Sequence, residues 1–396
     1  MLSASTIKIV KSTAPVLEVH GNAITKVFYH NLFEAHPELL NIFNHANQSK
    51  GRQQAALANT VYAAAVHIEN LSAIIPVVQQ IAQKHRSLGI KAEHYPIVGE
   101  FLLKAIKEVL GDAATDEIIQ AWGEAYGVIA DVFIQTEEAL YKEAETQEGG
   151  WRYFKEFIVT KKVQENDKIV SFYLKAADDK KLPAYKPGQY ITVQVTIPGE
   201  KYLHNRQYSL SQAAGEDAYR ISVKREDEGN PSGIVSVYLH EQLQEGDTLK
   251  VSAPAGEFHL DTTSKAPVAF ISGGVGITPL MSMFETIATT DAERKTAFIH
   301  CARSENLHAF DTEIQERLEK MPNAAYIKLN SNEPEGIINR GFIKQNIALE
   351  SKVYVCGPVG FMEAVINDLY ALGFKESQVH FEFFGPAMQL QVKVQA

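Results

Sequence analysis

Residues 268–279 read VAFISGGVGITP, an apolar run followed by a glycine-rich turn. The run VAFIS predicts a buried strand, and Thr278 and Pro279 are typical of the cap and first turn of a helix. Glycines between a strand and a helix let the backbone approach a diphosphate, which the helix N–H groups can then bind. The turn alone is weak evidence for a nucleotide site. Its candidate binding residues are Gly273, Gly274, Val275, Gly276, Ile277, Thr278 and Pro279.

Apolar runs and helical stretches alternate from this turn to the end of the sequence. The runs TAFIHCA, AAYIKL and KVYVCGP begin at residues 296, 324 and 352, and segments with helical periodicity lie between them. This alternation is typical of a doubly wound, parallel sheet. We therefore expect an α/β nucleotide-binding domain over residues 263–396.

Two different patterns precede this domain. Residues 151–262 contain short β-branched and aromatic runs between Gly and Pro turns, which predicts an antiparallel β-barrel. Residues 1–141 are rich in Ala, with apolar residues three and four apart, which predicts an all-α domain. The segment KEAETQEGG, residues 142–150, has no large apolar residue and predicts a linker. The fold class is therefore multidomain.

Composition excludes several classes of protein. The 396 residues are 45% hydrophobic and 22% charged, which is typical of globular domains rather than disordered chains. A net charge of −10 opposes binding to nucleic acid or to anionic membranes. Two cysteines cannot build a disulfide framework or a Cys-rich zinc site. Since we recognise no signal peptide and no uninterrupted apolar span, we expect a cytoplasmic protein without membrane insertion, and a monomer.

One histidine of the helical region stands out. His85 follows Val77 and Ile81 at four-residue spacing, which places it on the core-facing stripe of a helix. An isolated histidine there would most simply be a satisfied core residue. Glu137 lies on the same face as Phe133, however, and a buried carboxylate needs a partner because burying it unpaired costs several kcal/mol.

The helical region resembles a bacterial globin, because Tyr29, Phe43, Gln53, Leu57 and His85 occur in globin order. The resemblance implies that His85 is the proximal ligand to the iron of haem b and that Phe43 packs on the porphyrin. It also implies that Tyr29, Gln53 and Leu57 line the distal pocket. Without these companions, Tyr29 would equally suit a core aromatic whose hydroxyl bonds locally.

Three further residues match the flavohaemoglobin branch of that family. Tyr95 and Glu137 occupy the places of the residues that orient the proximal imidazole, and Lys84 adjoins the ligand. A carboxylate that accepts the second N–H of a metal-bound histidine makes the imidazole a stronger donor. Such iron favours oxygen activation over storage. By the same resemblance Tyr29, Tyr95 and Glu137 are the candidate catalytic residues.

The middle region resembles the ferredoxin-reductase-like flavoproteins. The motif at 206–209 matches R-x-Y-S, in which alternate strand residues share a face and would contact FAD. R-x-Y-S alone arises by chance on exposed strands, but a P-G-Q-Y turn precedes it and a helix start follows. We expect the acidic residues Glu226, Asp227 and Glu228 to form a solvated turn. The candidate FAD-binding residues are Gln189, Tyr190, Arg206, Gln207, Tyr208, Ser209, Gly233 and Ser236.

The C-terminal region carries the nicotinamide-side motifs of the same family. C-G-P lies at 356–358. The resemblance implies that Glu382 joins Ser209 and Cys356 around the hydride path, and that Phe384 covers the flavin where nicotinamide must land. Cys356 would otherwise be a small buried residue at a strand end. Arg303 and Ser304 suit a 2′-phosphate or an ordinary loop, so NADH and NADPH both stay open. The candidates are Cys356, Gly357, Pro358, Glu382, Phe383, Phe384, Gly385 and Pro386.

Taken together, the resemblance to flavohaemoglobins covers essentially the whole chain. It implies a nitric oxide dioxygenase, in which NAD(P)H reduces FAD, FAD reduces haem b, and NO and O2 give nitrate. The alternatives are a general NAD(P)H-flavin reductase with an incidental haem and a haem-based O2 or NO sensor. We recognise no output or DNA-binding segment, which disfavours the sensor.

Overall fold

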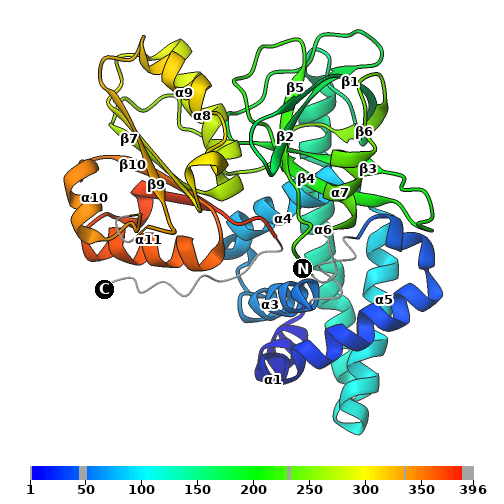
Figure 1. Ribbon diagram of the computed structural model, residues 1–396. Helices are drawn as coiled ribbons and strands as arrows, with labels where there is room; N and C mark the ends of the chain where they lie inside the picture. The colour runs from blue at the N-terminus through cyan, green and yellow to red at the C-terminus, as the bar shows by residue number, and fades with distance from the viewer. Residues whose placement is uncertain (1, 44–50, 230–232, 334–335, 386–396) are drawn as a thin grey trace. The chain divides into compact units, whose positions relative to one another are not determined.

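The computed structural model describes residues 2–43, 51–229, 233–333 and 336–385 (Figure 1). The chain divides into two compact units. The first comprises Met1–Gln147, Trp151–Phe154 and Gln194–Arg206, and the second comprises Glu148–Gly150, Lys155–Val193 and Gln207–Ala396. Each unit is described by itself below.

The N-terminal region is helical, which confirms the predicted all-α domain. Its α-helices are α1 (Ala4–Ala35), α3 (Arg52–Val66), α4 (Ile75–Leu88), α5 (His94–Leu110) and α6 (Asp116–Thr146). Short 3₁₀ turns separate them: η1 (Pro37–Asn41), η2 (Leu71–Ile74) and η3 (Gly111–Ala113).

Local sequence explains where these helices begin and end. The side chains of Ser3 and Thr115 accept backbone N–H groups at the starts of α1 and α6. Gly89, with φ at 77°, ends α4 in the left-handed conformation that glycine adopts without strain. Helix α6 runs to Thr146, into the segment predicted as a linker, because its Ala, Glu and Lys residues are good helix formers.

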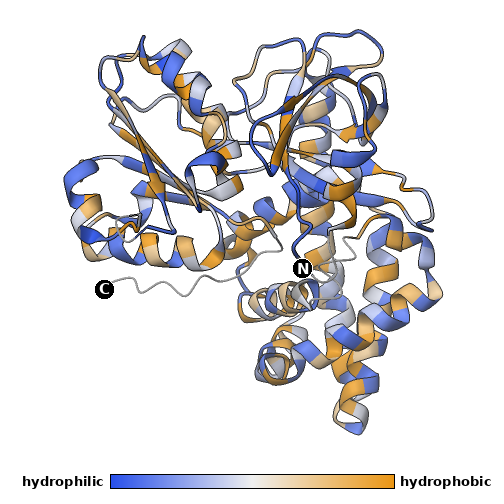
Figure 2. Cartoon of the chain, in the orientation of Figure 1, coloured by the Kyte–Doolittle hydropathy of each residue, from blue (hydrophilic) through white to orange (hydrophobic). Residues whose placement is uncertain are grey.

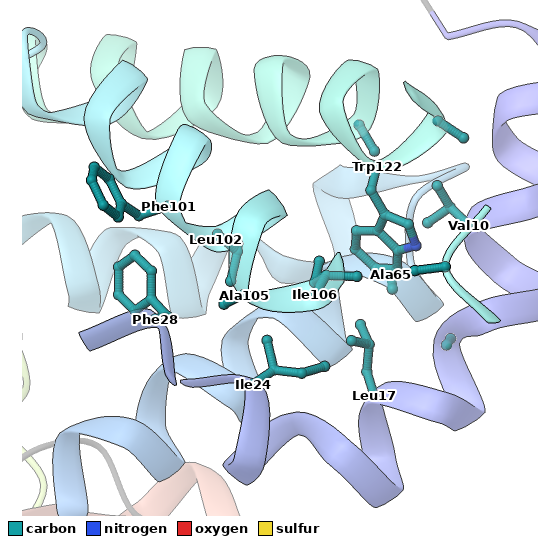
Figure 3. Packing of buried hydrophobic residues seen from close by; sticks show 14 of the residues in the cluster. Val10, Leu17, Ile24, Phe28, Ala65, Phe101, Leu102, Ala105, Ile106 and Trp122 are labelled. Atoms are coloured by element: carbon teal, nitrogen blue, oxygen red, sulfur yellow. The ribbon is translucent and has the colours of Figure 1, made fainter. Parts of the chain in front are cut away.

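Helices α1, α3, α5 and α6 pack around an apolar core (Figure 3), and Val78 of α4 packs in a second cluster with Phe133. Residues from α1, α5 and α6 meet there, and Figure 3 shows the Trp122 side chain close to Val10 and Ile106. Burial of such side chains is the main favourable contribution to folding. The labelled core residues are Val10, Leu17, Ile24, Phe28, Ala65, Phe101, Leu102, Ala105, Ile106 and Trp122.

The middle region forms a six-stranded sheet in the order β4-β3-β6-β1-β2-β5. The pairs β1–β2 and β2–β5 are antiparallel, as the predicted antiparallel domain requires. Alternation brings Phe157 and Val159 of β1 to the buried face. The elements are β1 (Phe154–Gln164), β2 (Ile169–Ala176), β3 (Tyr190–Val195), β4 (His204–Ser209), β5 (Tyr219–Lys224), α7 (Ile234–Glu241) and β6 (Thr248–Ser252).

The C-terminal region forms a five-stranded sheet in the order β11-β10-β7-β8-β9, with the paired strands parallel. Its strands are β7 (Val268–Gly273), β8 (Thr296–Ala302), β9 (Ala324–Asn330), β10 (Lys352–Cys356) and β11 (Val379–Glu382). Its helices are α8 (Ile277–Thr290), α9 (Asp311–Leu318), α10 (Arg340–Asn346) and α11 (Val359–Ala371). The 3₁₀ turns are η4 (Gly274–Gly276), η5 (Glu305–Leu307) and η6 (Glu376–Gln378).

Strand β7 lies in the middle of this sheet and is buried on both faces. Phe270 packs into the apolar cluster on one face, and Ala269 and Ile271 pack into the cluster on the other. Helices such as α11 alternate hydrophobic and hydrophilic residues (Figure 2), as expected of helices that cover a sheet. The predicted doubly wound α/β domain is confirmed. Within the described residues, every helix is too short or too polar to cross a membrane.

Candidate functional site

Helices α4, α5 and α6 bring together the three predicted residues His85, Tyr95 and Glu137. The His85 Nδ1 atom lies 2.7 Å from Glu137 Oε1 and 3.2 Å from the Tyr95 hydroxyl. Tyr95 donates its hydroxyl hydrogen to the same Glu137 oxygen at 2.5 Å. Burial, and then the charge of Glu137, raises the pKa of Tyr95, so this phenol stays protonated. Since Nδ1 donates to a carboxylate, the ring presents Nε2 as its lone-pair donor.

This donor set fits a haem iron. A neutral imidazole whose Nδ1–H is held by a carboxylate is the usual form of a metal-binding histidine. The described residues contain no cluster of three His, Cys, Asp or Glu side chains that would hold a metal ion without a prosthetic group. His85 therefore suits a cofactor that brings its own equatorial ligands.

The predicted distal residues also leave a polar atom without a partner. Tyr29 is 7% exposed, and burial raises the pKa of its hydroxyl. The Gln53 amide hydrogen-bonds this hydroxyl, and within the described part of the chain Gln53 Oε1 is buried without a partner. A buried unsatisfied carbonyl costs about 1–3 kcal/mol and is explained by a missing ligand or water. Tyr29 and Gln53 thus fit the side of a pocket that receives a polar molecule.

Aromatic rings surround Tyr29. The Tyr29 ring lies 5.8 Å from the ring of Phe43 and 5.6 Å from that of Phe33, and Phe33 lies 5.2 Å from Phe43. Leu57 packs against the same apolar cluster. The predicted Tyr29, Phe43 and Leu57 are therefore neighbours in one apolar environment, whereas Lys84 adjoins His85 along α4.

Sequence reasoning missed a support for Tyr95. The Tyr126 hydroxyl on α6 donates to the backbone oxygen of Tyr95 at 2.6 Å. Gly99, one turn after Tyr95, makes room for this ring, since a Cβ there would lie 2.4 Å from Tyr126. A glycine inside α5, where it weakens a helix, was the signal that a large side chain lies against it.

Strand β4 carries the predicted R-x-Y-S motif. Arg206 and Tyr208 alternate with Gln207 and Ser209 along it, so each pair shares one face. The Arg206 guanidinium donates to the backbone oxygen of Asn205 at 2.8 Å. Ser209 is 8% exposed, whereas the three residues before it are half-buried.

The predicted Gln189, in the turn before β3, hydrogen-bonds two backbone groups. Gln189 Oε1 accepts the N–H of Lys186 at 3.0 Å, and its Nε2 donates to Gly256 O at 3.1 Å. Tyr190 packs over Gly256, where a Cβ would lie 2.9 Å from the ring. In this structure Gln189 therefore shapes the turn that presents Tyr190.

Ser236 holds the start of α7. Its hydroxyl donates to Gly233 O at 3.1 Å and accepts the N–H of Glu226 at 3.2 Å. Gly233 N–H also donates to Glu226 O at 2.6 Å. These bonds join the predicted Gly233 and Ser236 to the acidic segment before the helix.

The acidic segment is a solvated turn, as expected: the side chains of Glu226 and Glu228 are exposed, and that of Asp227 is partly exposed. Its carboxylates form surface ion pairs that the sequence did not indicate. Asp227 Oδ1 lies 3.0 Å from Lys168 Nζ, and this ammonium lowers the pKa of Asp227 to about 2. Glu228 pairs with both Lys168 and Arg303, which are distant in sequence, and Glu226 accepts from the nearby Lys224 at 2.8 Å.

The glycine-rich turn packs against the C-G-P turn at the end of β10. A Cβ on Gly276 would lie 2.2 Å from the backbone oxygen of Cys356, and one on Gly357 would lie 3.1 Å from Gly273 Cα. Pro358 contacts the same place, 3.0 Å from a Cβ on Gly273. Glycine is thus required for two adjacent strand ends to approach each other.

Thr278 does not cap the following helix as predicted. Helix α8 begins at Ile277 with Gly276 as its N-cap, so Thr278 lies within the first turn. Its hydroxyl donates to Val275 O at 3.0 Å instead of accepting a backbone N–H. Pro279 follows in the first turn, where its missing N–H costs nothing.

Cys356 and Glu382 are register partners on the parallel strands β10 and β11. Cys356 is fully buried, and burial raises the pKa of its thiol. Phe384 is 44% exposed, whereas Phe383 packs into a core cluster and its ring fills the space beside Gly385. Pro386 lies outside the described residues.

Three family models match successive parts of the chain. They are the globin family over residues 26–133, the oxidoreductase FAD-binding domain over 156–260 and the oxidoreductase NAD-binding domain over 270–367. The chain is also 54% identical to a flavohemoprotein of Bacillus thuringiensis, over 99% of this chain and 100% of the relative. It is 49% identical to a flavohemoprotein of Bacillus subtilis over the full length of both.

Solved structures agree with these matches. A flavohemoglobin of Malassezia yamatoensis, which has bound FAD and heme, aligns with a TM-score of 0.86 at 27% identity, covering 97% of this chain and 100% of that one. The FAD/NAD-binding domain of a nitric oxide dioxygenase from Vibrio cholerae aligns with a TM-score of 0.54 at 34% identity, covering 59% and 99%. With relatives this similar over its whole length, the chain belongs to the flavohemoprotein family.

Proposed function

We propose that this flavohemoprotein is a nitric oxide dioxygenase, which uses NAD(P)H, FAD and haem b to convert NO and O2 to nitrate. Two NO and two O2 would take one electron pair from NAD(P)H, giving two nitrates, NAD(P)⁺ and a proton. The observation that carries the proposal is the contact of His85 with Glu137 and Tyr95, since a carboxylate on the proximal histidine suits oxygen activation better than oxygen storage. We propose that residues 1–141 form the haem domain, 151–262 the FAD domain and 263–396 the NAD(P) domain, with 142–150 as the linker.

His85 would bind the haem through Nε2, while Glu137 accepts its Nδ1–H. Glu137 is 3% exposed, so little water weakens this hydrogen bond. Tyr95 donates to the same oxygen, which fixes the carboxylate in one orientation. When bound, haem supplies iron that exchanges single electrons and binds O2, and FAD divides the electron pair of NAD(P)H.

Tyr29 would act on the opposite side. Because Gln53 already donates to its oxygen, the Tyr29 hydroxyl hydrogen is available to a ligand. The raised pKa keeps that hydrogen on Tyr29 at neutral pH. Tyr29 would offer this hydrogen bond to a polar ligand in the pocket, and Phe43 and Leu57 would keep the pocket apolar.

The reductase half would supply the electrons. We propose that Arg206, Tyr208 and Ser209 of β4 bind FAD and that the turn from Gly273 to Pro279 binds the phosphates of NAD(P)H. Cys356 and Glu382, which face each other across β10 and β11, would border the nicotinamide. Phe384, which is exposed two residues after the end of β11, would cover the flavin.

The test is a stoichiometry measurement on the purified chain loaded with haem and FAD. NO, O2 and NAD(P)H consumption are followed together with nitrate formation. We expect two nitrates for each NAD(P)H and a strong acceleration of NAD(P)H oxidation by NO. NAD(P)H oxidation that is indifferent to NO would identify a general reductase, and tight NO or O2 binding without turnover would identify a sensor.

A further inference from the structure

Two buried histidines lie behind the glycine-rich turn. His300 of β8 places Nε2 3.3 Å from the backbone oxygen of Gly274, and its Nδ1 lies 3.1 Å from Nδ1 of His308. His308 Nε2 in turn lies 3.0 Å from Oδ1 of Asn330, the last residue of β9. The two histidines are 0% and 6% exposed. A continuous line of hydrogen bonds therefore joins the end of β9 to the turn.

Asn330 fixes the protonation at the outer end of this line. Its Nδ2 donates to Glu333 Oε1 at 3.1 Å, and its amide also hydrogen-bonds Glu305. Ionised carboxylates only accept hydrogen bonds, so the amide nitrogen must face them and the amide oxygen must face His308. His308 Nε2 therefore carries a hydrogen.

Gly274 fixes the protonation at the inner end. A carbonyl oxygen only accepts, so His300 Nε2 carries a hydrogen. Burial, and then the charge of His308, lowers the pKa of His300 to about 3, so His300 is neutral and its Nδ1 is an acceptor. His308 Nδ1 must then donate as well. With both of its nitrogens donating, His308 is an imidazolium.

This arrangement sets the orientation of the turn. In a planar trans peptide the C=O and the next N–H point in opposite directions. Because His300 and the N–H of Ile277 both bind Gly274 O, the N–H of Val275 points away from His300. Gly274 has φ at 53° and open space around it, so its own side-chain packing does not hold this peptide.

We propose that His308 is a positioning residue for the phosphates of the nicotinamide nucleotide. Its imidazolium holds His300 in the tautomer that binds Gly274 O, and so aims the Val275 N–H at the phosphates. The inference rests on the proposed nucleotide role of this turn. His308 touches neither nucleotide nor flavin and acts only through His300.

The experiment measures binding of ADP-ribose to the full chain loaded with haem and FAD, by titration calorimetry. ADP-ribose carries the diphosphate but cannot be oxidised or reduced. H308F keeps an aromatic ring against His300, whose ring centroid lies 4.8 Å away, but removes both donors. We expect its Kd to be about tenfold higher than that of the parent chain, equivalent to ~1.4 kcal/mol.

A second pair of variants covers the case in which H308F folds poorly. Asn330→Leu keeps both histidines and removes the acceptor for His308 Nε2, so its Kd should also rise. Asn323→Leu makes the same change just before the opposite end of β9, where Asn323 bonds Glu293 O, and should leave the Kd unchanged. Equal Kd values for the parent chain, H308F and Asn330→Leu would overturn the proposal, as would a parent chain that does not bind ADP-ribose. Intact ADP-ribose binding without nitrate formation would count against the proposed function alone.

Discussion

Glu137 Oε1 is 2.7 Å from His85 Nδ1, and the same oxygen also accepts the hydroxyl of Tyr95. One carboxylate oxygen therefore receives two hydrogen bonds, from α4 and from α5. The negative charge of Glu137 is balanced through these two donors, which are the groups that orient the proposed iron ligand. The electronic effect of Glu137 on the iron can be separated from its structural effect.

Glu137→Gln should separate the two, because the amide keeps the size of the side chain and loses its charge. We expect haem to be retained, the ferric/ferrous potential to rise and nitrate turnover to fall about 10–100-fold, the range for changes to the partner of a metal-bound histidine. Redox potentiometry and nitrate assays measure these effects. Glu138→Gln, which makes the same change at the next position and weakens the ion pair with Arg152 instead, is the control. An unchanged potential would contradict the proposed role of Glu137.

His85→Ala should yield protein that contains FAD and lacks haem, because the variant has lost the nitrogen proposed to bind iron. The absorption spectrum of the purified variant checks this, since the Soret band and the flavin bands are distinct. NAD(P)H should still reduce its flavin at the rate of the parent chain. A Soret band of full intensity would show that the iron ligand lies elsewhere.

Tyr29→Phe should slow nitrate formation by about 10–100-fold, which corresponds to losing one hydrogen bond to a charged or strongly polar group. Reduction of the flavin by NAD(P)H should not change, since Tyr29 lies in the helical domain. Stopped-flow absorption follows flavin reduction, and a nitrate assay follows the product. An equal loss of both rates would favour the general reductase.

Gly99→Ala should destabilise the helical domain by about 1–3 kcal/mol, because the new methyl group overlaps the Tyr126 ring and overpacks the interface of α5 with α6. Gly127→Ala is the matched control, since a Cβ there meets nothing within 4 Å inside helix α6. It should be neutral or stabilising by up to about 1 kcal/mol. Denaturant unfolding monitored by circular dichroism measures both. Equal effects of the two changes would show that Tyr126 yields freely.

Arg220→Met should destabilise the second unit by about 3–5 kcal/mol, because Arg220 is the more deeply buried of two arginines, with Arg317, that face Glu285 and Glu313. Arg220 contacts Glu285 at 3.2 Å and Glu313 at 2.8 Å, and both Arg220 and Glu285 are 3% exposed. Burial raises the pKa of Glu285, so without Arg220 this residue should bind a proton at neutral pH. Arg340→Met, which breaks the surface pair with Asp368, should cost less than about 1 kcal/mol. Thermal unfolding compares the two variants.

The fold could be predicted from the repeating patterns of apolar residues in the sequence. Strand β7 could be predicted because its residues are apolar without interruption, and α4 because Val77, Ile81 and His85 repeat every four residues. The candidate site emerged where a polar residue broke such a pattern, as Glu137 does in α6. These patterns involve residues close together in the sequence, so they can be recognised without the structure.

The rest depended on contacts between distant residues. Lys168 pairs with Asp227, 59 residues away, and Arg303 pairs with Glu228, 75 residues away. No local pattern in the sequence predicts these ion pairs. Thr278 was misplaced because a 3₁₀ turn, Gly274–Gly276, moves the helix start by two residues. The hydrogen-bonded line from Asn330 through His308 to Gly274 joins three separate loops, so only the folded chain reveals it.

A Cβ at position 276 would collide with Cys356 O, so Gly276 and Gly274 of the glycine-rich turn should differ in their tolerance to mutation. A saturation library should accept only glycine at position 276, because even a methyl group would meet a backbone atom that cannot rotate away. Two residues earlier, Gly274 has an open surrounding and a left-handed backbone that asparagine also adopts. Natural variation and laboratory evolution in this loop should therefore enter at Gly274 and leave Gly276 untouched.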